Sequence, residues 1–209
     1  MTPGATSIYK CPNCGRFTSR GSINSGNTFG ATRFSDGYMI APMLPEFPSI
    51  VKCEDCKTFY WLNKDLKIGE YYFKCDNDEW KKADNAKFLT IDELQEAINC
   101  KIYNSEQEQK YLRRKLWWAF NDKIRKNDLQ FSEEDAKLFE ENCLKLLELL
   151  NKNNTDENIM TAELFRNLGK FSECHDILEN ITEKKYFLTK KTIEKECNIK
   201  NRKVTEIKQ

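Results

Sequence analysis

Histidine is almost absent from this chain of 209 residues, in which His175 is the only one. A Ser-His or Cys-His catalytic system needs a histidine as its base, and a histidine-rich metal site needs several. His175 lies in a segment of helical periodicity, where a packing or surface role needs no further assumption. The composition therefore disfavours histidine-based catalysis.

Long apolar runs and an excess of one charge are also absent. No run approaches the roughly 18–20 apolar residues of a membrane span, and the low mean hydropathy predicts a soluble protein. The first ten residues have neither a basic region nor an apolar core, which predicts no secretory signal. Lys and Arg number 34 against 33 Asp and Glu, so there is no overall field to attract nucleic acid.

Cysteine, by contrast, is abundant, and four of the nine residues form two Cys-x-x-Cys pairs, Cys11/Cys14 and Cys53/Cys56. Cysteines at this spacing direct both sulfurs toward one ion, and two such turns complete a tetrahedral four-thiolate shell, which suits Zn²⁺. A closed shell indicates a structural zinc, because a catalytic zinc keeps an open position. A thioredoxin-like redox interpretation lacks the βαβ pattern that such a motif requires.

The other five cysteines, Cys75, Cys100, Cys143, Cys174 and Cys197, are scattered. All of them except Cys75 lie in helix-like segments. Free cysteine in a helix commonly behaves as a small buried hydrophobe, and a disulfide scaffold is more often short and secreted. We therefore predict a reducing, cytoplasmic location. Cys75 is either a partly buried thiol on a strand or a group near the metal.

The first 80 residues have the pattern of strands and loops. Asp36-Gly37 between two β-prone runs is a strong hairpin signal, because the turn needs positive φ angles. The expected strands are residues 8–10, 31–35, 38–41, 50–52, 58–62 and 71–73.

From about residue 81 the pattern is helical. Thr90 with Glu93 forms a capping box, Ser105 and Ser132 are further N-caps, and Gly169 is a stop signal. The predicted helices begin at Thr90, Ser105 and Ser132, and near Thr155, Ser172 and Lys185. The tail after Asn201 is expected to fray.

The two knuckles resemble the zinc-ribbon family. Cys-Pro-x-Cys-Gly at residues 11–15 is a common form of its first knuckle, and Cys53-x-x-Cys56 before an aromatic strand resembles the second. The family implies a small antiparallel β module with one structural zinc. The 38 residues between the knuckles are more than usual, which suggests an extra hairpin in the insert.

Residues 162–181 resemble one tetratricopeptide repeat. The matching positions are Ala162, Phe165, Gly169, Phe171, Leu178 and Ile181, and Cys174 replaces the family's usual alanine. Such repeats normally stack in threes or more, and no second clear copy is present. The whole layout also resembles bacterial proteins of unassigned function, which adds no activity.

Two further patterns have weaker functional interpretations. The loop Gly26–Gly30 lacks the Gly-Lys-Ser/Thr ending of a phosphate-binding loop, so a packed loop or partner contact is the simpler interpretation. Between residues 104 and 126 basic residues outnumber acidic ones 7 to 3, which allows nucleic-acid binding, although solvated helix faces explain it with fewer assumptions.

The sequence predicts an α+β protein with a zinc-ribbon domain at 1–80 and an all-helical, repeat-like domain at 81–209. The leading hypothesis is a non-enzymatic scaffold with one structural Zn²⁺ and a protein partner. The alternative is a nucleic-acid-binding zinc ribbon. An enzyme with its site in the insert is the third hypothesis, although the nearby carboxylates (Asp36, Glu46, Glu54 and Asp55) form no pair by spacing.

Overall fold

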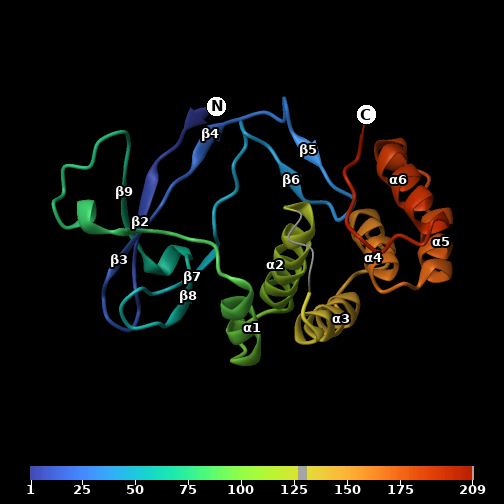
Figure 1. Ribbon diagram of the computed structural model, residues 1–209. Helices are drawn as coiled ribbons and strands as arrows, with labels where there is room; N and C mark the ends of the chain where they lie inside the picture. The colour runs from blue at the N-terminus through green and yellow to red at the C-terminus, as the bar shows by residue number, and fades with distance from the viewer. Residues whose placement is uncertain (127–130, 209) are drawn as a thin grey trace. The chain divides into compact units, whose positions relative to one another are not determined.

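The computed structural model describes residues 1–126 and 131–208, in which small sheets are followed by six α-helices (Figure 1). The α+β prediction is thus confirmed. The chain forms two compact units. The first comprises Met1–Ala31 and Ala41–Ile102, and the second comprises Thr32–Ile40 and Tyr103–Gln209. The proposed folding of 1–80 and 81–209 as separate domains stays a prediction.

The first unit is built on a four-stranded sheet in the order β10-β3-β2-β9 (Figure 1). All its pairs are antiparallel except β10 with β3. Two antiparallel ladders, β7-β8 and β1-β4, accompany it. The strands of this unit are β1 Thr2–Pro3, β2 Thr6–Lys10, β3 Phe17–Arg20, β4 Ile23–Ser25, β7 Ile50–Lys52, β8 Phe59–Trp61, β9 Lys67–Tyr71 and β10 Asp84–Asn85.

The strand expected at residues 71–73 is wrong in its position, because β9 ends at Tyr71. Phe73 has a φ of 56°, in the left-handed region that an extended strand cannot contain. Its side chain is 93% exposed, so the aromatic run does not supply a buried strand. Gly69 is needed within β9, because a Cβ there would lie 2.2 Å from the Trp80 ring.

Helix α1 (Ile91–Asn99) also belongs to the first unit. The predicted capping box is present, since Thr90 and Glu93 satisfy each other's backbone amides. The Trp61 indole donates a hydrogen bond to the Ile102 carbonyl at 2.9 Å, and Lys52 pairs with Glu96 at 2.6 Å. These contacts join the end of α1 and its exposed face to β8 and β7.

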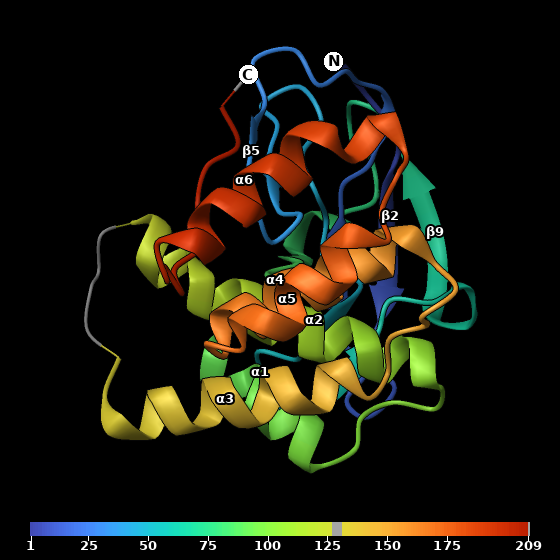
Figure 2. The same ribbon diagram turned by 90° about the vertical axis from the view of Figure 1, so that its right-hand side faces the viewer.

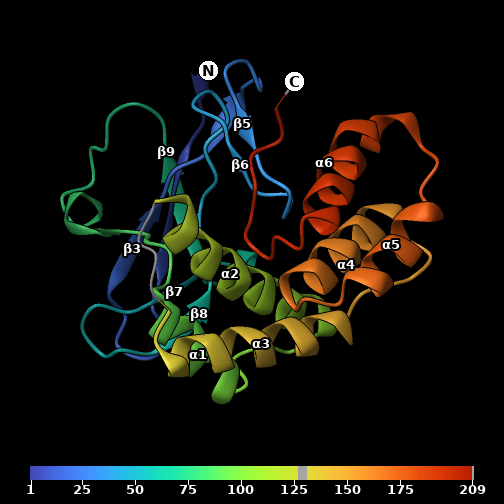
Figure 3. The same ribbon diagram turned by 45° about the vertical axis from the view of Figure 1, so that its right-hand side comes forward.

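Five helices form most of the second unit, with α2 beside α3 and α4, α5 and α6 side by side (Figures 2 and 3). Their bounds are α2 Glu106–Arg125, α3 Glu133–Leu147, α4 Thr155–Asn167, α5 Phe171–Glu179 and α6 Phe187–Asn198. Ser105 and Ser132 cap α2 and α3 as predicted, and Gly169 ends α4 with a φ of 76°. A short 3₁₀ helix, η3 (Lys184–Tyr186), leads into α6.

The last three helices share one apolar core. Its buried members are Ile159, Ala162, Cys174, Leu178, Ile181, Ile193 and Cys197. Cys174 and Cys197 are buried thiols that lie 2.9 Å apart, as expected of cysteines acting as small apolar residues. The resemblance of α4 and α5 to a tetratricopeptide repeat remains a prediction.

The second unit is not purely helical, because the hairpin β5-β6 (Thr32–Arg33 and Met39–Ile40) belongs to it. The Asp36-Gly37 turn forms as predicted, with Gly37 at a φ of 76°. The C-terminal tail does not fray, since Glu206 bridges to Phe34 and the Ile207 amide donates to the Arg33 carbonyl at 2.8 Å (Figure 1). The hairpin's free backbone groups give the tail these partners.

Among the described helices, none combines the length and apolar character needed to cross a bilayer.

Candidate metal centre

Each Cys-x-x-Cys pair lies in a tight turn between two antiparallel strands. β2 leads into the first turn and β3 leaves it, while β7 and β8 flank the second. The Cys11 amide donates to the Arg16 carbonyl at 2.8 Å, and the Cys53 amide donates to the Thr58 carbonyl at 2.9 Å. The two turns therefore have matching backbone hydrogen bonds, and each presents its sulfurs on the same side.

The residue after each pair has a left-handed backbone. Gly15 has a φ of 78°, as the tight turn predicted, and Lys57 at the equivalent position has a φ of 59°. Both residues close the turn by donating to the carbonyl of the first cysteine, at 3.0 Å in each case. A left-handed residue is therefore common to the two turns, although only the first uses glycine.

The four predicted ligands converge on one point. The Sγ atoms of Cys11, Cys14, Cys53 and Cys56 all lie within 4.8 Å of one another. Sulfur–sulfur distances are 3.6 Å for Cys11 with Cys56 and 3.5 Å for Cys14 with Cys53. A tetrahedron with Zn–S bonds of about 2.3 Å needs separations of about 3.8 Å. Four thiols in this arrangement could hold one metal ion.

Burial and hydrogen bonding shift the pKa values of three of these thiols in different directions. Cys11 and Cys53 are buried, and burial raises the pKa of the Cys53 thiol to about 12 and also raises that of Cys11. Backbone amides oppose this rise by hydrogen bonding to both sulfurs. Hydrogen bonding of the Cys56 sulfur with the Thr58 side chain and backbone lowers the pKa of Cys56 to about 5. The buried thiols must therefore lose protons before they can act as ligands.

We expect metal affinity to fall as the pH is lowered. At pH 7 Cys11 and Cys53 carry protons that metal binding must displace, so affinity should drop at least about 100-fold per pH unit. Below about pH 5 protonation of Cys56 should steepen the fall. Chelator competition between pH 6 and 8, corrected for the chelator's own protonation, measures this slope. A pH-independent affinity would contradict the thiol ligand set.

An arginine that the sequence interpretation missed connects the two turns. Arg16, directly after the first turn, forms two hydrogen bonds of 2.8 and 2.7 Å to Asp55 in the second and also pairs with Asp84 of β10. These carboxylates raise the pKa of the Arg16 guanidinium. The buried Tyr60 hydroxyl lies 2.7 Å from the Thr18 hydroxyl and joins β8 to β3. In the sequence, the only signal of the contact between Arg16 and Asp55 was that residues of opposite charge occur at the two knuckles.

Other residues singled out in the sequence lie outside the thiol group. The Cys75 sulfur lies 3.4 Å from the Asn77 carbonyl, and among the described residues only the four paired cysteines form such a cluster. His175 is partly exposed on α5. Gly26 packs against the backbone of Met43, whose carbonyl oxygen would lie 2.2 Å from a Cβ at position 26. This close approach supports a packed loop rather than a phosphate cradle.

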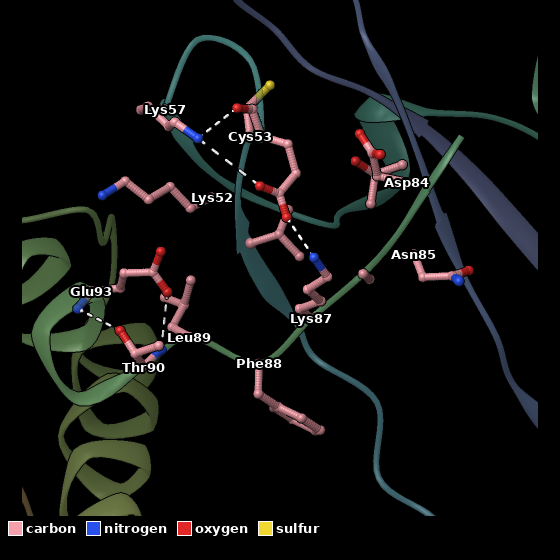
Figure 4. A pocket seen from close by; sticks show the side chains of 14 residues that line it. Lys52, Cys53, Lys57, Asp84, Asn85, Lys87, Phe88, Leu89, Thr90 and Glu93 are labelled. Carbon is pink, nitrogen blue, oxygen red and sulfur yellow. Dashed lines mark hydrogen bonds and ion pairs between the residues drawn. The ribbon is translucent and has the colours of Figure 1, made fainter. Parts of the chain in front are cut away.

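A cleft of about 340 Å³ adjoins the second knuckle (Figure 4). Its charged side chains already have partners within the first unit. Lys87 pairs with Glu54 at 2.8 Å, Lys57 donates to the Glu54 carbonyl at 2.6 Å, and Lys52 pairs with Glu96. The cleft therefore offers few free charges to a ligand.

The second unit buries a group of charged side chains, and sequence reasoning did not predict their burial. Glu163 and Arg166 of α4 are fully buried and hydrogen bonded to each other, and the Ser35 hydroxyl of the hairpin turn donates to Glu163 at 2.6 Å. Asp36 in the same turn pairs with Arg125 of α2. Asp36 therefore belongs to a buried network of the second unit, not to a site formed by the insert in the ribbon.

The basic residues of α2 are mostly used inside the second unit. Lys110 pairs with Glu157 at 2.9 Å and Lys123 with Asp135 at 2.7 Å. Arg114 and Lys115 lie over the Trp118 ring, 5.0 and 4.8 Å from its centroid. Internal partners therefore account for most of the charge excess that suggested nucleic-acid binding.

Comparisons with protein-family models, with curated proteins and with solved structures found no match to this chain. The site is therefore interpreted from its own geometry.

Proposed function

We propose that this chain is a non-enzymatic interaction protein whose first unit is a zinc ribbon. The observation that carries the proposal is the convergence of Cys11, Cys14, Cys53 and Cys56 within 4.8 Å. Four thiolates suit Zn²⁺ and fill its tetrahedral shell, so no position remains for a substrate or a reactive water. The zinc is structural in this proposal and fixes the two β-turns.

The interaction role belongs to the helical unit in this proposal. Its last three helices share a core and still expose large apolar side chains, including Phe187 at 63% and Leu188 at 44%. The resemblance of residues 162–181 to a tetratricopeptide repeat favours a protein partner. None of the nine cysteines, all of which the structure describes, forms a disulfide, which favours a reducing cytoplasm as the location.

Nucleic-acid binding is the weaker alternative. Its main support was the basic helix, and most cations of α2 have carboxylate or aromatic partners in the second unit. A protein that tracks a phosphate backbone needs such cations free to displace counterions. This observation ranks a protein partner first.

Native mass spectrometry and affinity capture together test the proposal. We expect native mass spectrometry to show one zinc ion per chain. In the capture experiment, the zinc-loaded chain should retain a protein from an extract of the cells that produce it, and this binding should persist after nuclease treatment. If the chain is purified without metal and binds no zinc when zinc is added, the zinc-ribbon proposal is excluded. Recovery of nucleic acid alone, lost in high salt, would favour the alternative.

A further inference from the structure

A second cleft, of about 890 Å³, lies between α6 and the segment that precedes it. Its lining includes Ile181, Lys184, Phe187, Lys190, Lys191 and Glu194. Phe187, Lys191 and Glu194 follow one another at i, i+4 and i+7, so they share one face of α6. Ile193 and Cys197 point from the same helix into the core. The cleft therefore lies on the side of α6 that the core leaves uncovered.

The cleft has an apolar part. Ile181 is 4% exposed, while Phe187 is 63% exposed. Leu188, next in the chain, is 44% exposed. An exposed phenylalanine beside a cavity bounded by a buried isoleucine can cover an apolar side chain of a partner, which releases water from both.

The cations of the cleft are of two kinds. Lys190 is occupied, since it pairs with Glu194 at 3.8 Å and donates to the Ile181 carbonyl at 3.1 Å. Lys184 and Lys191 are exposed, and neither has an ion-pair partner among the described residues. Of the lining carboxylates, Glu183 accepts a hydrogen bond from Thr155 at 2.6 Å, and Glu194 pairs with Lys190. Glu183 keeps its negative charge, because its hydrogen-bond donor is neutral. The lining charges without an ion pair are therefore Lys184 and Lys191 against Glu183, and their sum is positive.

We propose that this cleft binds an acidic peptide segment that also carries a large apolar side chain. Carboxylates of the peptide would meet Lys184 and Lys191, and its apolar side chain would lie against Phe187. Charge complementarity selects such a partner, because the two free ammonium groups repel a basic one. The inference rests on the proposed function and names the partner's chemistry.

Nucleic acid fits these observations less well. Lys185, the other lysine near the start of α6, is engaged by Asp156 at 3.8 Å and lies 4.4 Å from the Tyr186 ring centroid. Two free cations beside an apolar cavity make a short phosphate track, whereas a peptide uses both the charge and the apolar surface.

The test uses the whole zinc-loaded chain and a phage library of random 12-residue peptides. We expect selected peptides to be rich in Asp and Glu together with Leu, Ile or Phe. Fluorescence anisotropy with one labelled selected peptide should show about tenfold weaker binding to K184E/K191E. Phe187→Ala should weaken binding by a similar factor through lost apolar contact.

The matched control is K137E/K152E. It makes the same change of net charge at two exposed lysines of the same unit that have no ion-pair partner among the described residues. We expect peptide affinity within about twofold of wild type for this control, and unchanged circular dichroism for both double variants.

Three outcomes would overturn the inference. The selected peptides could lack acidic residues, or K184E/K191E could bind the labelled peptide as tightly as K137E/K152E does. A labelled single-stranded oligonucleotide could also bind the wild-type chain and bind K184E/K191E more weakly, while peptide affinity stays the same. Each leaves the zinc ribbon and the protein partner to be judged by metal content and affinity capture. Failure of those two experiments would remove the proposed function instead.

Discussion

Replacing Glu163 by Gln should lower the free energy of unfolding of the second unit by about 3–5 kcal/mol. The Glu163 and Arg166 side chains are both 0% exposed, and Arg166 donates to Glu163 through Nε at 2.8 Å. Burial raises the pKa of Glu163, and the Arg166 guanidinium and Ser35 hydroxyl oppose that rise. Without the carboxylate, a guanidinium that is always protonated stays buried with no counter-charge.

Glu148→Gln is the control, because Lys145 and Glu148 form an ion pair of the same i,i+3 spacing with side chains 56% and 61% exposed. Its loss should cost less than about 1 kcal/mol. The double variant Glu163→Gln/Arg166→Gln should recover part of the stability, since neither position then buries an unpaired charge. Urea unfolding followed by helical circular dichroism measures all three. If Glu163→Gln and Glu148→Gln lowered the free energy of unfolding equally, the buried Glu163–Arg166 pair would contribute no more to stability than the exposed Lys145–Glu148 pair.

Cys53→Ser should abolish metal binding and unfold the first unit while α2 to α6 stay folded. A structural zinc in a small module contributes about 10–16 kcal/mol of apparent binding free energy, and the small core around Tyr9, Val51 and Tyr60 includes Cys11 and Cys53 themselves. Loss of one ligand therefore removes both the metal and part of the core. Hydrogen exchange should become fast in β2, β3, β7 and β8, and metal content should fall to zero.

Cys75→Ser controls for the loss of a thiol as such. Its sulfur lies outside the four-cysteine group and near the Asn77 carbonyl, so one ion per chain should remain. Retention of metal by Cys53→Ser, or its loss from Cys75→Ser, would require a different ligand set. Protection of α2 to α6 should be equal in both variants, because α4 to α6 share a core and Phe120 of α2 packs against Phe139 of α3.

The sequence by itself determined the local features of this protein. The spacing of the cysteines, the Thr90–Glu93 capping box and the Asp36-Gly37 turn each depend on residues a few positions apart. Turn and cap chemistry is decided by such neighbours, so these features could be predicted without knowledge of the fold. The convergence of the four thiols was also predictable, because a metal ion requires it.

Only the tertiary structure decided which unit each segment joins. Glu163 and Arg166 match an ordinary surface i,i+3 pair in the sequence, and their complete burial depends on Ser35, 128 residues earlier than Glu163. The same holds for the C-terminal tail, whose position at the end of the chain predicted fraying, whereas the hairpin supplies backbone partners to it. Local propensity contains no information about contacts of such large sequence separation, and those contacts decide which charges are buried and which remain free.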